Sequence, residues 1–247
     1  LFFFLCLPVL GFSQVDPNIF EKFESKFYEI DGYNINVEVL GEGDPIFFLP
    51  GGPGNSHDYM QGNFGQYYKT NTVVFFDFLG RGKSDDAKDV SEYSVENDVA
   101  LIEKLRQVLG YTKISLVGHS YGTVPAQAYA TKYIYYHNTS LKQNVPKGNY
   151  RGWANDVYVE IIGRDGDFDV SGSMINQDYR QQLKDVKAKT LIIAGRYDGV
   201  STPEFAVQYK TFMPQAQFVM FEQSAHNPYL EEPEKFYELF ESFFNIK

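Results

Sequence analysis

The stretch LVGHSYGTVPAQAYA (residues 116–130) places a serine between two glycines, after an apolar run and before a helical one. This arrangement fits the pattern G-x-S-x-G, in which a strand turns sharply into a helix. Glycines at Gly118 and Gly122 let the neighbouring backbones approach closely, so the hydroxyl of Ser120 stands out above the end of the sheet. The helix beneath it favours developing negative charge. The stretch therefore predicts a nucleophile rather than an ordinary turn.

A serine nucleophile needs a histidine base and an acid that orients the histidine. In this architecture they follow in the order serine, acid, histidine, each at the end of a strand. Asp198 ends the apolar run of residues 189–198, and His226 follows the run that begins at residue 216. We therefore expect Ser120, Asp198 and His226 to form a catalytic triad.

Other histidines and acids compete for these roles on weaker grounds. The chain has three further histidines, of which His119 precedes the serine and is expected to point away from it; the other two are His57 and His137. The aspartates Asp169 and Asp185 are weaker candidates for the acid, because neither closes an apolar strand. A turn aspartate before Gly199 is the alternative interpretation of Asp198.

The stretch FFLPGGPGNSHDY (residues 47–59) supplies a glycine-rich loop after an early strand. Such a loop contributes one backbone donor to an oxyanion hole, and the residue after the nucleophile contributes the other. We therefore expect the N–H groups of Gly52 and Tyr121 to bind the oxyanion. Gly51 and Gly54 would let the loop pass close to substrate, which makes Gly51 a candidate substrate-binding residue.

The remaining patterns predict an α/β domain. Short apolar runs typical of buried parallel strands alternate with helical periods, which indicates a mostly parallel sheet covered by helices. The expected strands are 26–30, 34–40, 45–50, 71–78, 113–120, 189–198 and 216–226, the first two forming a hairpin; the expected helices are 94–110, 121–133 and 231–247. We divide the chain into a first core part (14–133), a shortened cap or insertion over the sheet edge (134–182) and a second core part (183–247).

Composition narrows the function classes. The net charge of −10 over 247 residues argues against nucleic acid and anionic membranes as partners. Residues 1–13 are apolar and too short to span a bilayer, which favours part of a secretory signal cleaved before Gln14 over a buried strand, and predicts a secreted or periplasmic protein. The only cysteine is Cys6, so the mature chain would hold no disulfide or thiolate metal site.

The motifs PGGPG, DFLGRGKSD (residues 77–85), GHSYG, GRYD and SAHNPYLEEPEKF together resemble the α/β-hydrolase superfamily, and within it the proline iminopeptidases of peptidase family S33. The resemblance runs from about residue 25 to 247. It implies an enzyme that releases an N-terminal residue, often proline, from a short peptide through an acyl-enzyme, without metal or cofactor. It also implies an acidic residue in the cap that binds the peptide's amino group. GRDGDF (residues 163–168) is similar to the family's stretch, which gives this role to Asp167, with a solvated loop charge as the alternative.

Three departures from the family pattern stand out. Pro50 replaces the histidine that braces the glycine-rich loop, and Gly199 replaces the acid that often follows the catalytic aspartate. The segment between Ser120 and Asp198 is also short for the family, so we expect the sixth sheet strand and the first half of the cap to be absent. The run of residues 133–136 could replace part of that strand.

The leading hypothesis is a serine aminopeptidase acting on short peptides. One alternative is a carboxylic ester hydrolase with the same triad acting on another small molecule, and another is a catalytically impaired relative or binding module. The sequence carries no signal for the oligomeric state.

Overall fold

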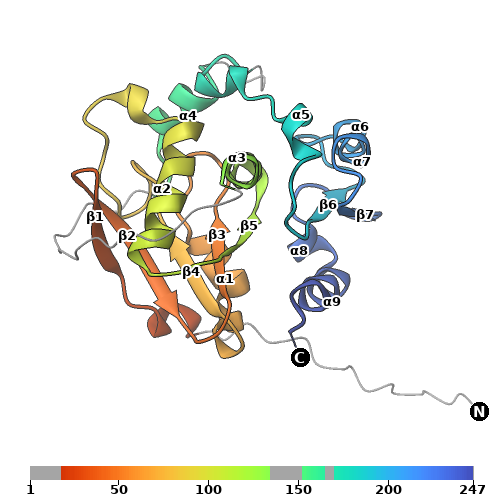
Figure 1. The fold of residues 1–247 in the computed structure, drawn as a ribbon, viewed down its shortest axis with the longest axis horizontal. Helices are drawn as coiled ribbons and strands as arrows, with labels where there is room; N and C mark the ends of the chain where they lie inside the picture. Colours follow the sequence, from red (N-terminus) through yellow and green to blue (C-terminus); the bar gives the residue numbers. More distant parts are fainter. Residues whose placement is uncertain (1–17, 134–151, 165–169, 247) are drawn as a thin grey trace, which may run out of the picture.

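A five-stranded mixed sheet forms the first part of the protein (Figure 1). The computed structural model describes residues 18–133, 152–164 and 170–246. The strand order is β1-β2-β4-β3-β5, with bounds β1 (Lys26–Ile30), β2 (Tyr33–Leu40), β3 (Pro45–Leu49), β4 (Thr72–Phe76) and β5 (Ser115–Gly118). Strand β2 is antiparallel to β1 and β4, whereas β3 is parallel to β4 and β5. Every residue of β4 is buried, as a continuous apolar run predicts for a central strand.

The predicted hairpin is confirmed. Strands β1 and β2 pair with Ile30 opposite Tyr33, which leaves Asp31 and Gly32 as the two-residue loop. Both loop residues have positive φ (55° and 80°), the geometry that matches the twist of the flanking strands and favours an Asp-Gly pair.

Helices cover both faces of the sheet. Ser94 caps the start of helix α2, because its side chain accepts a hydrogen bond from the Asn97 N–H. The α-helices are α1 (Asp58–Phe64), α2 (Val95–Val108), α3 (Thr123–Lys132), α4 (Asn155–Ile161), α5 (Arg180–Leu183), α6 (Pro203–Ala206), α7 (Tyr209–Phe212), α8 (Pro228–Glu231) and α9 (Pro233–Phe244). The 3₁₀ helices are η1 (Ile19–Lys22), η2 (Gly65–Lys69), η3 (Val90–Glu92), η4 (Ser120–Gly122) and η5 (Ser173–Asn176).

A second sheet contains only two strands. Strands β6 (Leu191–Gly195) and β7 (Gln217–Phe221) are parallel and pair with each other, and Figure 1 shows them to the right of the larger sheet. Within the described ranges no strand lies between β5 and β6 along the chain, and β5 forms an edge of its sheet. The position of the expected sixth strand is therefore a break between two sheets. Residues 134–136 lie outside the described residues.

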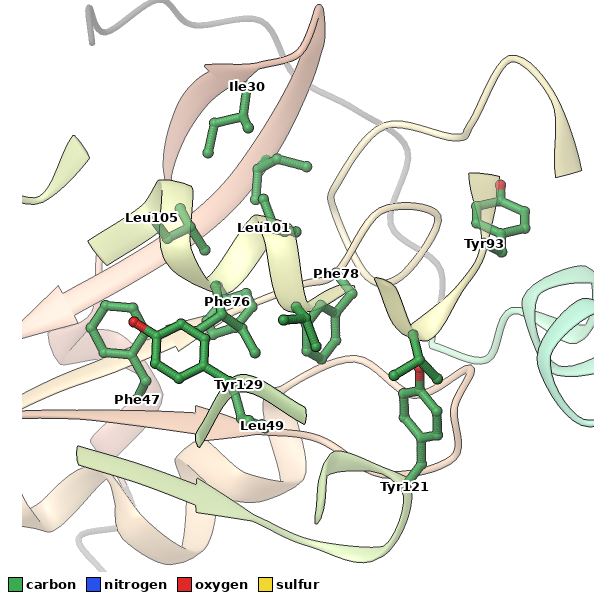
Figure 2. Packing of buried hydrophobic residues seen from close by; sticks show 14 of the residues in the cluster. Ile30, Phe47, Leu49, Phe76, Phe78, Tyr93, Leu101, Leu105, Tyr121 and Tyr129 are labelled. Carbon is green, nitrogen blue, oxygen red and sulfur yellow. The ribbon is translucent and has the colours of Figure 1, made fainter. Parts of the chain in front are cut away.

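Apolar side chains pack on both faces of the larger sheet. On one face, the sheet packs against α2 and α3, and Figure 2 shows Phe47, Phe76 and Leu105 in this cluster. On the other face, Phe48 and Phe64 stack with ring centroids 5.2 Å apart. Helix α9 joins this second cluster through Phe240, whose ring lies 4.9 Å from that of Tyr67 and 5.5 Å from that of Phe64. An aromatic joint thus ties the C-terminal part to the larger sheet.

The middle of the chain contributes to the main core. Ala154, Val157 and Ile161 are fully buried and belong to the same cluster as β3 and α2. The Ala154 N–H donates to the Gly54 carbonyl at 2.8 Å, so the segment lies directly on the glycine-rich loop. Residues 154–161 of the predicted insertion therefore contribute side chains to the main core. The predicted signal segment, residues 1–13, lies outside the described residues, and the other domain boundaries stay predictions.

Candidate active site

Ser120 stands at a strained turn between β5 and α3. Its φ is +51°, in the left-handed region that few non-glycine residues adopt. A Cβ on Gly118 would come within 2.5 Å of the Gly122 carbonyl oxygen, and a Cβ on Gly122 within 2.1 Å of the Leu49 oxygen. The glycines are thus required by close approach of backbone to backbone, and strain at the nucleophile is typical of a functional site.

The structure brings the three predicted catalytic residues together. Ser120 Oγ lies 3.0 Å from His226 Nε2, and His226 Nδ1 lies 2.9 Å from Asp198 Oδ2. Because a carboxylate only accepts, Nδ1 carries the imidazole proton and Nε2 is left to accept the serine hydroxyl. The other oxygen of Asp198 accepts the backbone N–H groups of Val200 and Ser201 at 2.8 and 2.9 Å. These bonds fix the orientation of the acid, which is 8% exposed.

The loops that carry Asp198 and His226 are held to each other. The Tyr197 N–H donates to the Ser224 carbonyl at 2.9 Å. A Cβ on Gly195 would lie 1.9 Å from the Ala225 oxygen, so only glycine permits this approach. The acid and the base therefore move as one unit, while the nucleophile belongs to the larger sheet.

The glycine-rich loop lies against the nucleophile. A Cβ on Gly51 would lie 2.8 Å from Ser120 Cβ, which leaves no room for a side chain. The Gly51 N–H donates to the Tyr59 hydroxyl at 2.7 Å, so this amide is engaged within the protein. Gly52 has φ of +121°, and no hydrogen bond among the described residues occupies its N–H. Gly52 thus keeps the free donor that an oxyanion hole needs, whereas Gly51 would meet substrate only through its backbone surface.

A buried ion pair connects the two predicted oxyanion segments. Arg81, fully buried, donates to both carboxylate oxygens of Asp98 at 2.9 Å and to the Pro53 carbonyl at 2.9 Å. The Tyr121 hydroxyl donates to the same carboxylate at 2.7 Å, and Figure 2 shows the ring of Tyr121 entering the core. Burial raises the pKa of Asp98, against the opposing effects of Arg81 and Tyr121. The loop next to Gly52 and the residue after the nucleophile therefore share one anchor.

Two residues at the site were missed by the sequence reasoning. His119 does not point away: its ring centroid lies 5.4 Å from that of His226, and its Nε2 lies 3.3 Å from the His226 carbonyl oxygen. Tyr59 contacts His119 Nδ1 at 2.9 Å as well as Gly51. The sequence offers no local signal for these contacts, because 60 positions separate the two side chains.

The other candidate acids have no part in this arrangement. Asp185 is exposed near the end of α5, and in the part of the chain that the structure describes it makes no hydrogen bond to His226. Asp167 and Asp169 lie outside the described residues. Among the described residues, no group of three histidine, cysteine or acidic side chains could hold a metal ion. Nor does any helix in the described ranges combine the length and apolar character needed to span a bilayer.

The fold is that of the α/β hydrolases, and Ser120, His226 and Asp198 lie in the arrangement of a serine triad. A family model described as alpha/beta hydrolase fold matches residues 44–147. Among solved structures, the proline iminopeptidase of Mycobacterium smegmatis superposes with a TM-score of 0.74 at 17% identity, covering 90% of this chain and 98% of that one. An esterase from Exiguobacterium antarcticum gives a TM-score of 0.67 at 23% identity, covering 89% and 99%.

The more particular likeness is to proline iminopeptidases, to which this chain is similar over most of its length. The proline iminopeptidase of Saccharolobus solfataricus is 27% identical over 304 residues, covering 88% of this chain and 95% of the relative. That of Heyndrickxia coagulans is 26% identical over 283 residues, covering 89% and 98%. Since these alignments are longer than this chain of 247 residues, the relatives carry residues that have no counterpart here.

Proposed function

We propose that the protein is a serine aminopeptidase that releases an N-terminal residue, of the proline type, from short peptides. The observation that carries the proposal is the continuous hydrogen-bonded line from Ser120 Oγ through the His226 ring to Asp198, at 3.0 and 2.9 Å. The similarity to proline iminopeptidases over 88% of the chain supports the choice of substrate class.

The geometry supports acyl transfer in two steps. Ser120 Oγ attacks the carbonyl of the N-terminal residue while His226 Nε2 takes its proton, and Asp198 stabilises the imidazolium. The N–H groups of Gly52 and Tyr121 bind the oxyanion, each contributing about 3 kcal/mol at the transition state. His226 then returns the proton to the leaving amine as the C–N bond breaks. Water, deprotonated by the same imidazole, attacks the acyl-enzyme and releases the amino acid.

A carboxylic ester hydrolase is the second candidate. It is favoured by Gly199, which stands where the family often has an acid for the peptide's amino group, and by the fold shared with an esterase. The same triad and oxyanion donors would serve either reaction, since both pass through a tetrahedral intermediate.

Hydrolysis of proline naphthylamide, compared with a short nitrophenyl ester, distinguishes the two candidates. We expect the amide to be cleaved and N-acetylation of the proline to abolish cleavage. Cleavage of the ester alone, with no effect of a blocked amino group on peptides, would contradict the peptidase assignment.

A fluorophosphonate probe tests whether the triad is active at all. We expect covalent labelling of the wild-type chain and none of Ser120→Ala, with Ser242→Ala, an exposed serine on α9, as the control that keeps its label. An unlabelled wild type would favour the catalytically impaired relative.

We also propose that the protein is exported and acts on small substrates, without nucleic-acid or membrane partners. The apolar run of residues 1–13 and the net charge of −10 support this placement. Expression of the full chain in a bacterium and N-terminal sequencing of the recovered protein tests it: a periplasmic product starting at Gln14 is expected, and an unprocessed cytoplasmic product would overturn the proposal.

A further inference from the structure

A line of hydrogen bonds joins the glycine-rich loop to the backbone of the catalytic histidine. The Gly51 N–H donates to the Tyr59 hydroxyl at 2.7 Å, and this hydroxyl lies 2.9 Å from His119 Nδ1. On the other side of the ring, His119 Nε2 lies 3.3 Å from the His226 carbonyl oxygen. The line starts beside the nucleophile on the larger sheet and ends at the loop after β7.

The donor and acceptor roles along this line are fixed by chemistry. The His226 carbonyl can only accept, so His119 Nε2 carries a proton. The Tyr59 oxygen already accepts from Gly51, and its own proton has no other acceptor among the described residues than His119 Nδ1. In a neutral imidazole that is protonated at Nε2, Nδ1 carries no proton and accepts the hydrogen bond from the Tyr59 hydroxyl. A doubly protonated His119 would turn an N–H toward the hydroxyl and break it.

The surroundings of His119 favour the neutral ring. Burial lowers the pKa of His119, and burial raises the pKa of Tyr59, so both groups stay uncharged near neutral pH. The titratable groups that face His119 are Tyr59 from α1, Tyr229 from α8, and His226 with Asp198 from the loops after β7 and β6.

The line of hydrogen bonds also braces the glycine-rich loop, which the side chain at position 50 does not do. Proline has no side-chain donor or acceptor and no N–H, so Pro50 cannot brace the loop. The Tyr59 hydroxyl holds the loop from α1 instead, one residue from the expected oxyanion donor Gly52.

We propose that Tyr59 is a positioning residue. Through Gly51 on one side and His119 on the other, it fixes the position of the oxyanion loop relative to the catalytic histidine. The inference rests on the proposed serine hydrolase function. The hydrogen bonds of Tyr59 go to Gly51 and His119 and not to Ser120, so we expect its effect to be on geometry at the transition state. A misplacement of about 1 Å costs a rate on the order of 100-fold.

The first test is Tyr59→Phe, which removes one hydroxyl and keeps the ring. We expect kcat for the nitrophenyl ester or proline naphthylamide to fall about 10- to 100-fold with KM changed less than about threefold, since the loss falls on the transition state. The matched control is Tyr237→Phe, whose hydroxyl donates to the Asn63 carbonyl at 3.4 Å and takes no part in the line; it should leave kcat unchanged. An unchanged kcat in Tyr59→Phe overturns the proposal.

The second test addresses the shared action of the two side chains. We expect His119→Leu to lower kcat as Tyr59→Phe does, and the double variant to lose no more than the worse single variant, because the residues act as one unit. His119→Gln keeps an acceptor and a donor and should recover part of the loss. Full additivity of the two losses in the double variant would contradict a shared action of Tyr59 and His119 through the line of hydrogen bonds.

The third test is spectroscopic and independent of activity. Imidazole ¹⁵N chemical shifts of the folded protein should show His119 protonated at Nε2 and bare at Nδ1, and this tautomer should become mixed in Tyr59→Phe. A proton on Nδ1 in the wild type overturns the inference. Failure of the proposed function is distinguishable, because it appears as absent fluorophosphonate labelling of the wild type whatever the tautomer.

Discussion

The five-stranded sheet and the two-stranded sheet of this protein differ in how completely they are buried. In the larger sheet, every residue of β4 and four of five in β3 are buried, whereas in the smaller sheet only two of five residues in β6 and one of five in β7 are. Yet the nucleophile follows β5 of the first sheet, a strand whose four residues are all half-buried, and its acid and base follow the strands of the second. Catalytic geometry therefore depends on how firmly the less buried part is held to the more buried one.

Two of the connections between the parts bear directly on the catalytic geometry. One is the aromatic joint, in which Phe240 of α9 packs on Phe64 and Tyr67. The other is the Tyr59–His119 line to the His226 carbonyl. The joint is formed by packed aromatic rings, whereas the line is formed by directional hydrogen bonds. Variants of each part test this division of roles.

Breaking the joint should have the largest effect on stability. Phe240→Ala removes a ring that is 3% exposed, so we expect a loss of about 3–5 kcal/mol in the free energy of unfolding, measured in urea. Activity should fall as well, because His226 is no longer held near Ser120. Phe243→Ala on the same helix is the control, since that ring is partly exposed and should cost much less. Equal losses in the two variants would mean that the packing of Phe240 on Phe64 and Tyr67 is not what holds the two parts together.

Loosening the anchor within the larger sheet should cost less. Tyr121→Phe removes the hydroxyl that donates to the buried carboxylate of Asp98 at 2.7 Å. A hydrogen bond to a charged group contributes about 1.5–3 kcal/mol, so the unfolding free energy should drop by that amount. Tyr197→Phe, whose side chain is largely exposed beside Asp198, should show no such loss. An equal loss in Tyr197→Phe would mean that the loss in Tyr121→Phe does not report the hydrogen bond to Asp98.

A pH titration should reveal a buried charge in the larger sheet. Burial alone would lower the pKa of His57, but the charges and hydrogen bonds of Asp77 and Glu38 outweigh it and raise the pKa to about 10. Because the folded-state pKa lies above the unfolded value, the stabilisation is complete below about pH 6.5 and is lost as the pH rises toward 10. The unfolding free energy should then fall by at most about 1.4 kcal/mol per pH unit in this window.

His57→Gln checks the assignment of that slope. The variant should be less stable near neutral pH and show a flatter dependence between pH 7 and 10. The same slope in wild type and variant would assign the titration to another group.

The smallest effect is expected from the ion pair on the smaller sheet. Arg196 pairs with Glu222 at 2.7 Å, but both side chains are exposed to solvent. Exposed pairs are screened by salt and contribute little, so Arg196→Ala should leave the urea midpoint unchanged at 0.15 M salt. A clear loss of stability, absent at 1 M salt, would show that electrostatics help to hold β6 to β7.

Much of this site follows from the sequence because the determining signals are local. The backbone crowding that demands Gly118 and Gly122 occurs within a few residues of Ser120, and the hairpin follows from the single pair Asp31–Gly32. The order of Ser120, Asp198 and His226 then places each at a strand end. Such short-range rules can be applied without coordinates.

The connections between distant segments could not be predicted in the same way. Arg81 reaches Pro53 and Asp98 across 28 and 17 positions, and Tyr59 reaches His119 across 60. No periodicity or spacing encodes these contacts, because they depend on how helices and loops pack in three dimensions. The burial of Ala154 in the main core was missed for the same reason.

The break between the sheets leaves backbone N–H and C=O groups on the outer side of β5 without ladder partners among the described residues. Such a row is a template on which another polypeptide can adhere, and natural proteins limit the hazard by keeping edge strands short. Strand β5 has four residues, so only a few ladder bonds could form there. The brevity of this strand therefore protects the molecule against sticking to its own copies at a place where a longer one would invite aggregation.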